Sequence, residues 1–229
     1  TPFTPANMLT NSGFESGDYT GWNIYPGDLT NRSIEKTGND IYGGVSGTDT
    51  AMARTGTYML KTWGQNNGSD NTTPSYYEGD TSPGMSYTFG GYGNTMSPDS
   101  LKDGSQAWLQ IKFFDSSWGE LAGGTSDTMS ATSEPNKWHF LRTAATAPAG
   151  AAKVQAVIVH SQKGYSGGAV YWDDMDLSMV VGPKSNYGLG TRNVATGDLD
   201  GDGKGEVIFM KGRYTDDPQA GLWVYEADG

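Results

Sequence analysis

The residues best suited to binding a ligand form an acidic run near the C-terminal end of the 229-residue chain. Residues 198–206 read Asp-Leu-Asp-Gly-Asp-Gly-Lys-Gly-Glu. Alternate carboxylates on a glycine-rich turn can converge on one hard cation, and several oxygen ligands favour Ca²⁺ over a transition metal. The expected ligands are the side chains of Asp198, Asp200, Asp202 and Glu206 and the carbonyl of Lys204. The alternative is a solvated acidic turn, in which neighbouring carboxylates would repel one another.

The acidic run departs from the EF-hand pattern. An EF-hand loop ends in a glutamate, and this chain has Phe209 at that position. The stretch from Val194 to Ile208 instead resembles the calcium loops of FG-GAP-type propeller repeats and of rhamnogalacturonan-lyase-like propellers. This resemblance implies a calcium loop between strands and does not imply an activity.

A second group of acids lies near the two ends of the preceding segment. Residues 9–15 read Leu-Thr-Asn-Ser-Gly-Phe-Glu and are followed by Gly21-Trp22. Residues 169–177 read Ala-Val-Tyr-Trp-Asp-Asp-Met-Asp-Leu. Two adjacent acids inside an apolar strand are costly to bury unless a cation compensates them. The alternative is that both acids face water at the end of a strand.

Together, these end motifs resemble the jelly-roll carbohydrate-binding modules that bind xylan, laminarin and related glucans. The resemblance spans residues 7–180. It implies that the first and last strands are adjacent and that a structural Ca²⁺ lies between them. The ligands that it implies are Glu15 and either Asp173 or Asp174, with backbone carbonyls near Gly56.

Short alternating segments between glycine-rich turns predict an all-β fold. In residues 107–115, apolar side chains occupy one face and Trp108, Gln110 and Lys112 the other. Further strands are expected in residues 57–65, 138–145, 153–161 and 169–179. The predicted fold class is a β-sandwich jelly roll with a short C-terminal calcium-loop β-hairpin extension.

The chain is expected to contain a module at residues 6–181, a linker at residues 182–192 and a C-terminal piece at residues 193–229. The linker begins Gly-Pro-Lys-Ser-Asn, a composition that favours an irregular connection. The C-terminal piece has two apolar strands, at residues 206–210 and 222–225, which is too little for a core of its own. It is therefore interpreted as a calcium-loop hairpin or a truncated second domain.

Two strand faces combine an indole, an amide and an ammonium. Sugars present apolar C–H faces ringed by hydroxyls, which proteins bind with flat aromatic rings and planar polar groups. The expected ligand-binding residues on these faces are Lys61, Trp63 and Gln65 on one strand and Trp108, Gln110 and Lys112 on another. Either tryptophan could instead belong to the core.

A loop-edge site is the other open alternative for ligand binding. Several aromatic residues lie in segments rich in Gly, Ser and Asn, which predicts loops. They are Tyr42 and Tyr77, with Tyr76, Tyr92, Trp118 and Tyr165.

Composition excludes several classes of partner. The formal net charge of -11 argues against nucleic acid and anionic membrane surfaces, because binding phosphates needs cationic patches. No apolar run approaches the roughly 20 residues of a membrane span. The chain has 0 Cys, which excludes disulfides and thiolate metal sites. The N-terminal residues fit a mature secreted protein or a piece of a longer one, so an extracellular location is expected.

Catalysis is not predicted. Five carboxylates outside the acidic clusters could form an acid–base pair, namely Glu15, Glu35, Glu78, Glu120 and Glu134. None of them lies in a recognisable catalytic motif, and the nucleophile elbow and phosphate-binding loop are both missing.

The resulting hypothesis is a secreted, monomeric, Ca²⁺-stabilised module that binds a plant or algal polysaccharide or oligosaccharide. It would target a covalently linked catalytic domain, a polysaccharide lyase or glycoside hydrolase, to that substrate. One alternative is a lyase or hydrolase fragment with its own catalytic groove. Another is an adhesion module in which Ca²⁺ sets the geometry between domains.

Overall fold

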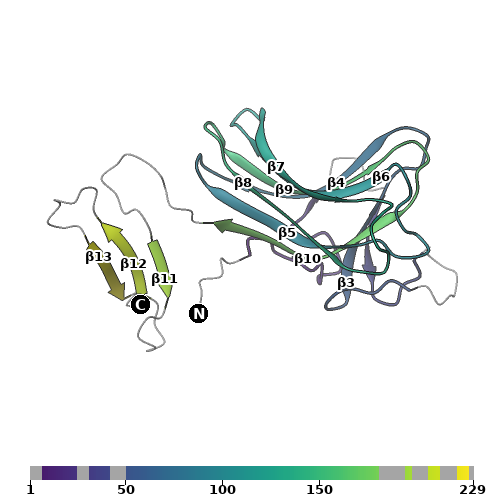
Figure 1. Ribbon diagram of the computed structural model, residues 1–229, viewed down its shortest axis with the longest axis horizontal. Coiled ribbons are helices and arrows are strands. Elements are labelled where there is room, and N and C mark those ends of the chain that lie inside the picture. The colour runs from purple at the N-terminus through teal and green to yellow at the C-terminus, as the bar shows by residue number, and fades with distance from the viewer. Residues whose placement is uncertain are drawn as a thin grey trace. The chain divides into compact units, whose positions relative to one another are not determined.

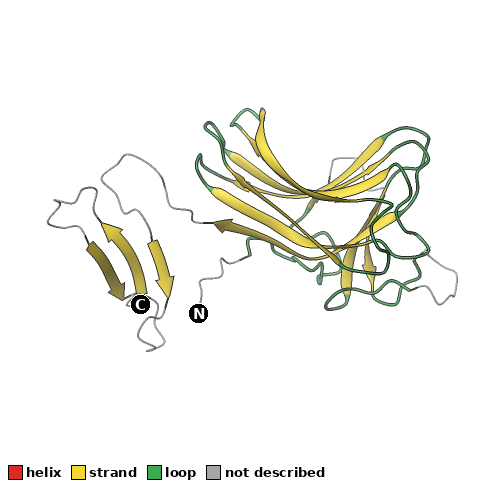
Figure 2. Ribbon diagram, in the orientation of Figure 1, coloured by secondary structure: helices red, strands yellow, loops and turns green. Residues whose placement is uncertain are grey.

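The computed structural model describes residues 7–24, 31–41 and 50–180, and the backbone of three further strands within residues 194–226. The chain divides into two compact units, of which one is Asn7–Met179 and the other contains Val180–Gly229. All regular elements in the described residues are strands (Figure 2). The expected linker at residues 182–192 lies outside the described residues.

Two five-stranded antiparallel sheets form the first unit and curve over one another (Figure 1). The first sheet consists, in spatial order, of β1 (Asn23–Ile24), β4 (Asn71–Asp80), β9 (Lys153–Gln162), β6 (Ser105–Phe114) and β7 (Glu120–Met129). The second consists of β2 (Arg32–Lys36), β3 (Tyr58–Trp63), β10 (Ala169–Val180), β5 (Ser86–Asn94) and β8 (His139–Thr146). The predicted all-β sandwich is confirmed.

The core lies between the two sheets. Each strand contributes alternate side chains because successive residues of a strand point to opposite faces. In β6, Leu109, Ile111 and Phe113 are completely buried in this core, as the alternation predicted. The second sheet contributes Leu60 and Trp172, and the Trp172 indole donates to the Thr62 hydroxyl at 3.0 Å.

The two end motifs lie side by side, as the resemblance implied. The Met8 amide donates to the Leu177 carbonyl at 2.8 Å. The Asn7 side chain donates to the Met175 carbonyl at 2.8 Å and accepts from the Leu177 amide at 3.0 Å. The chain segment before β1 therefore lies along β10.

The second unit contains a three-stranded antiparallel sheet, where two strands were expected. Its strands are β11 (Val194–Gly197), β12 (Glu206–Lys211) and β13 (Gly221–Glu226), in that order. Gly197 pairs with Glu206, so the acidic run joins two antiparallel strands. The missed strand, β11, is only 4 residues long and carries a weak alternation.

Candidate functional site

The two predicted tryptophan faces lie on opposite outer sides of the sandwich. Trp63 belongs to β3 of the second sheet, and Trp108 belongs to β6 of the first. Both side chains point away from the core between the sheets, and both are half-buried. The molecule therefore offers two separate surfaces, which differ in their neighbours.

The first surface is the outer side of β4, β9 and β6, here called the β9 face. β9 is the middle strand, and its Val157 and Val159 form an apolar floor that is 4% exposed. Aligned residues of the two neighbouring strands flank this floor on either side. The strand pairing aligns Pro74 and Trp108 with Val159, Tyr76 and Gln110 with Val157, and Glu78 and Lys112 with Gln155.

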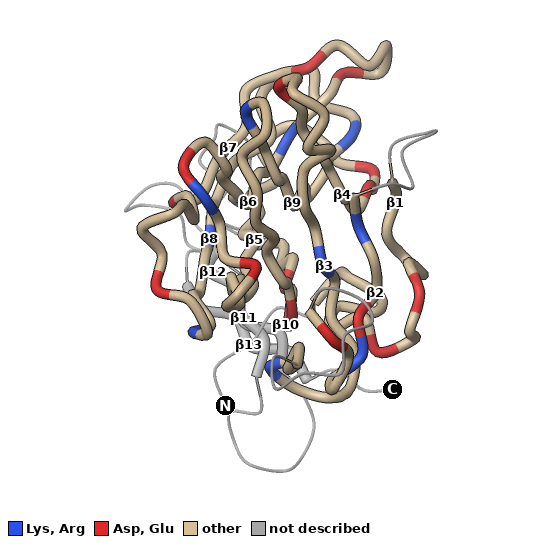
Figure 3. Tube along the Cα trace, turned by 90° about the vertical axis from the view of Figure 1, so that its right-hand side faces the viewer, with Lys and Arg blue, Asp and Glu red and all other residues tan. Residues whose placement is uncertain are grey.

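Polar groups on the β9 face are tied to one another. The Gln155 amide donates to Glu78 at 2.8 Å, and Lys112 forms an ion pair with Glu120 at 3.0 Å. These pairs hold planar polar side chains next to the apolar floor. Figure 3 shows basic and acidic positions interspersed along the chain trace.

An exposed indole stands near one end of the β9 face. Trp118 is 51% exposed and packs against Phe114 with 5.7 Å between ring centroids. The carboxylate of Asp115 accepts from the amides of Ser117 and Gly119, which fixes the turn that carries Trp118. Trp118 was not predicted on a strand face, because it lies in this turn and alternation applies only within strands.

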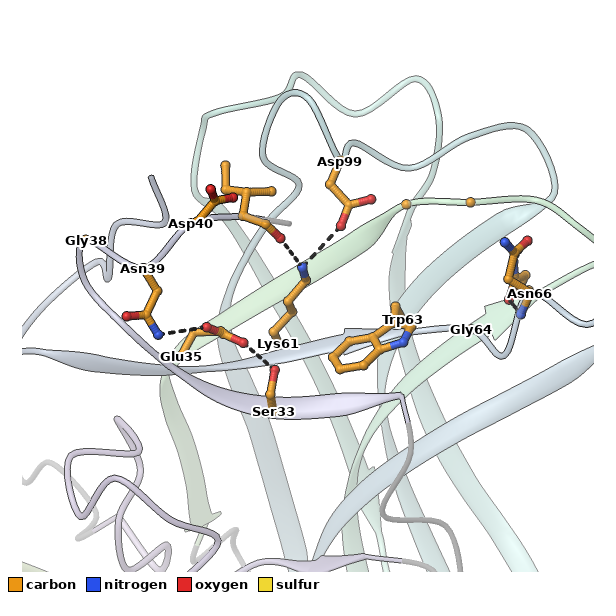
Figure 4. Close-up of a pocket in the computed structure, with 14 residues that line it drawn as sticks. Ser33, Glu35, Gly38, Asn39, Asp40, Lys61, Trp63, Gly64, Asn66 and Asp99 are labelled. Carbon is orange, nitrogen blue, oxygen red and sulfur yellow. Dashed lines mark hydrogen bonds and ion pairs between the residues drawn. The ribbon is translucent and has the colours of Figure 1, made fainter. Parts of the chain in front are cut away.

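The second surface is a hollow of about 760 Å³ beside β3, here called the β3 hollow. Figure 4 shows Lys61 and Trp63 of β3 on its floor, with Asp99 above Lys61. The Lys61 ammonium donates to the Ile41 carbonyl at 2.7 Å and pairs with Asp99 at 3.2 Å. Lys61 was predicted to contact ligand, and the structure instead commits its ammonium to these two partners.

Trp63 borders this hollow and packs against a second, smaller apolar cluster. That cluster includes Ile41, Ala51, Met59 and Tyr171, and it covers part of the outer side of β3. Gln65 does not continue the face, because β3 ends at Trp63. The backbone amide of Gln65 donates to the side-chain oxygen of Asn71 at 3.0 Å.

The predicted loop-edge aromatics are dispersed. Tyr77 lies in β4 and packs against the core between the sheets, so its placement in a ligand-binding loop was wrong. Its neighbour Tyr76 faces outward on the β9 face. Tyr92 also lies in a strand, and only Trp118 and Tyr165 are exposed in turns. Tyr42 lies outside the described residues.

The acidic side chains of the end motifs lie near Gly13, and the carboxylate of Glu15 lies beside Gly56. A Cβ at Gly13 would lie 3.4 Å from an oxygen of Asp173, 3.8 Å from one of Asp174 and 3.7 Å from Cγ of Glu15. Backbone amides already donate to two of them. The amides of residues 54 and 55 bond to Asp173, and those of residues 57 and 58 bond to Glu15.

A guanidinium supplies positive charge at this place. Arg54 pairs with Asp174 and stacks over the Tyr92 ring, 3.5 Å from its centroid. Burial raises the pKa of Asp173 to about 6, against the lowering effect of its amide partners. In the described residues no three His, Asp or Glu side chains are placed to hold a metal ion. The Ca²⁺ ligands that the resemblance implies, Glu15 with Asp173 or Asp174, stay a prediction.

The C-terminal calcium loop stays a prediction too. Residues 198–205 lie outside the described residues, and Glu206 is described by its backbone alone. The described residues also contain no helix long and apolar enough to cross a membrane.

Sequence comparison identifies no relatives: no protein-family model and no curated protein matches the chain. Solved structures are similar in fold. The family 22 carbohydrate-binding and catalytic modules of a Clostridium thermocellum endo-1,4-β-D-xylanase, complexed with xylohexaose, give a TM-score of 0.51 at 15% identity. That match covers 82% of this chain and 30% of the xylanase chain.

Two other similar structures have lower TM-scores. A family 61 carbohydrate-binding module in complex with β-1,4-galactotriose is 17% identical with a TM-score of 0.46, over 76% of this chain and 99% of that one. The enzymatically active domain of bacteriophage CBA120 tailspike protein 4 is 12% identical with a TM-score of 0.49, over 76% of this chain and 21% of that one. This chain therefore spans only a fraction of the tailspike and xylanase chains. The described residues show an all-β sandwich of the kind found in carbohydrate-binding modules.

Proposed function

We propose that the first unit binds a polysaccharide chain along the β9 face without catalysing a reaction. The observation that supports this function is the aligned set of Trp108, Tyr76 and Gln110 around the apolar floor of Val157 and Val159. Aromatic rings bind the C–H faces of sugars, and the amides and carboxylates beside them bond to the hydroxyls. Regular strands carry all of these groups, so the conformational entropy lost on binding should be small.

The shape of the β9 face suits an internal stretch of polysaccharide. From Pro74 to Asp80 the outward residues of β4 pair with β9 without a break. Six residue steps of about 3.4 Å give a surface about 20 Å long, which accommodates several sugar units. Acids and bases are paired with one another here, so the proposed ligand is neutral or weakly anionic.

The proposed biological role is targeting. A module that holds its substrate weakly raises the effective concentration of an enzyme linked to it. In this proposal the parent protein is a secreted polysaccharide lyase or glycoside hydrolase that acts on plant or algal material. Two of the solved structures similar in fold are named as binding oligosaccharides, which agrees with this choice of ligand class.

Ca²⁺ is retained in the proposal as a stabilising ion. The acidic run at residues 198–206 has the ligand chemistry of a Ca²⁺ site. Adding EGTA should lower the melting temperature of the full chain, and added Ca²⁺ should restore it. An unchanged melting temperature would remove Ca²⁺ from the account and leave the β9 face unaffected.

Affinity electrophoresis of the full chain tests the proposed function. Gels containing xylan, laminarin, β-glucan, galactan or polygalacturonate should include at least one that retards the wild-type chain. Trp108→Ala should restore free migration in that gel. Phe140→Ala is the matched control, because Phe140 is 58% exposed on the other sheet. Free migration of the wild-type chain in every gel would refute the function.

A further inference from the structure

The β3 hollow has the dimensions and lining of a second ligand site. Its volume of about 760 Å³ is within the usual range for small-molecule pockets. Its floor is β3 of the second sheet, and the inward-facing Gln162 of β9 lines one side, whereas the β9 face is the outer side of the first sheet. A ligand here would use none of the residues of the β9 face.

The polar lining of the hollow is rich in hydrogen-bond acceptors. Glu35, Asp40 and Asp99 supply three carboxylates, and Lys61 is the one cationic side chain among the described residues that line the hollow. The two oxygens of Glu35 accept from the Ser33 hydroxyl and the Asn39 amide, which hold its carboxylate at the edge of the hollow (Figure 4). Each carboxylate oxygen can accept more than one hydrogen bond, so Glu35 keeps acceptor capacity.

The charges of the hollow disfavour an anionic ligand. Three carboxylates against one ammonium leave an excess of negative charge, which repels uronates, sulfates and phosphates. The Lys61 ammonium occupies the centre of the floor, bonded to Asp99 and to the Ile41 carbonyl, and lies 5.6 Å from the centre of the Trp63 ring. A neutral molecule with many hydroxyl donors fits this lining, because the carboxylates accept hydrogen bonds.

The apolar part of the hollow is the indole of Trp63. In Figure 4 this ring lies along the floor between Lys61 and Asn66. Gly64 beside it leaves room for Gln162, since a Cβ at Gly64 would lie within 2.4 Å of the Gln162 side chain. Gln162 in turn accepts from the Asn66 amide at 2.9 Å. This bond fixes the turn that bounds one side of the hollow.

From this lining we infer that the β3 hollow binds a neutral saccharide unit, independently of the β9 face. The unit places a C–H face against Trp63 and donates hydroxyl hydrogen bonds to Glu35 and Asp99. Turns bound the hollow, so it suits a chain end or a side branch, and the open β9 face suits the middle of a chain. One protein molecule then has two saccharide sites on opposite sides of the sandwich.

Indole N–H resonances measure the two sites separately. The full chain, ¹⁵N-labelled, is titrated with xylotriose, cellotriose, laminaritriose, mannotriose, trigalacturonate and chitosan trimer at millimolar concentrations. Trp63→Phe and Trp108→Phe assign the two resonances. A saturable shift of the Trp63 resonance with at least one neutral trisaccharide, larger than with trigalacturonate, supports the inference. A Trp63 resonance that does not move, or that moves only with a charged trimer, overturns it.

Two conservative variants give the matched comparison. Glu35→Gln should weaken binding at Trp63 roughly fivefold to tenfold, because a carboxylate acceptor becomes a weaker amide acceptor. Glu78→Gln makes the same change on the β9 face and should leave the Trp63 titration unchanged. Equal effects of both variants on Trp63 would contradict an independent site. If the Trp63 resonance shifts and the Trp108 resonance does not, the proposed function of the β9 face is refuted and the inference about the β3 hollow stands.

Discussion

The β9 face and the β3 hollow both begin with an outward tryptophan on a strand, and they differ in what surrounds it. On the β9 face, the neighbours of Trp108 come from adjacent strands in regular register. In the β3 hollow, the neighbours of Trp63 come from turns, and an apolar cluster covers part of the strand. Strand alternation thus indicates which way a side chain points, and the loops decide whether it meets solvent.

The largest expected effect is on the pH dependence of stability, and it comes from a buried imidazole on the inner side of β9. His160 follows Val159 in β9, points to the inner side and has no hydrogen-bond partner for either ring nitrogen. Burial lowers the pKa of His160 from 6.5 to about 4. Between these values the unfolded chain binds a proton that the folded chain does not, so stability falls as pH falls. The expected contribution of His160 to this loss, from pH 6.5 to pH 4, is about 3 kcal/mol.

Urea unfolding of His160→Gln and His160→Leu at several pH values measures this effect. Relative to wild type, both variants should become more stable by about 3 kcal/mol as the pH falls from 6.5 to 4. His139→Gln, at a half-buried position at the start of β8, is the control for replacing an imidazole outside the core. A constant difference between wild type and the His160 variants at all pH values would contradict the buried, neutral imidazole.

Replacing either of two neighbouring tyrosines on β4 should change a different property, stability in one case and binding in the other. Tyr77→Ala removes contacts with the core and should lower the free energy of unfolding by about 2 kcal/mol. Tyr76→Ala should leave stability nearly unchanged and weaken polysaccharide binding about tenfold, through loss of a ring on the β9 face. Denaturant unfolding and affinity electrophoresis of both variants check this. The assignment of faces would be wrong if Tyr77→Ala weakened binding and left stability unchanged.

Lys61 should act as a structural residue within the β3 hollow. Lys61→Met leaves Asp99, whose pKa is already raised by burial, without its ammonium partner. The expected loss of stability is roughly 1–2 kcal/mol. Lys112→Met breaks a more exposed pair with Glu120 and should cost less than about 0.5 kcal/mol. Thermal unfolding of the two variants measures the contrast, and equal losses would contradict the assigned difference in burial.

Salt should have the smallest effect on binding. A neutral polysaccharide on the β9 face exchanges no net charge with the protein, so screening has little to act on. Retardation in affinity gels should change less than about twofold between low salt and 0.5 M NaCl. A steep loss of retardation with salt would indicate an anionic ligand.

The sequence predicted the fold well where hydrophobic alternation is strong. β6 alternates cleanly, and both its inner and outer sides were assigned correctly. β4 was not recognised, because its inward residues include Thr73 and Ser75, which are buried but polar. Without an apolar period, the sequence does not separate Tyr76 from Tyr77.

The candidate site was predictable only in part, because long-range contacts decide what is accessible. The partners of Lys61 are 20 and 38 positions away along the chain, in turns whose path the local pattern does not specify. Arg54 was not proposed as a partner of Asp174, and its separation of 120 positions explains why. The outward position of Trp108 was predicted because its neighbours follow from strand pairing, and the alternation indicates the strand.

A crystal structure of the full chain grown with xylohexaose, laminarihexaose or galactohexaose tests the central claim most directly. The account predicts an oligosaccharide along the β9 face, with sugar rings stacked on Trp108 and Tyr76 and hydroxyls bonded to Gln110. Sugar bound only elsewhere on the protein, with solvent over Trp108, would contradict it.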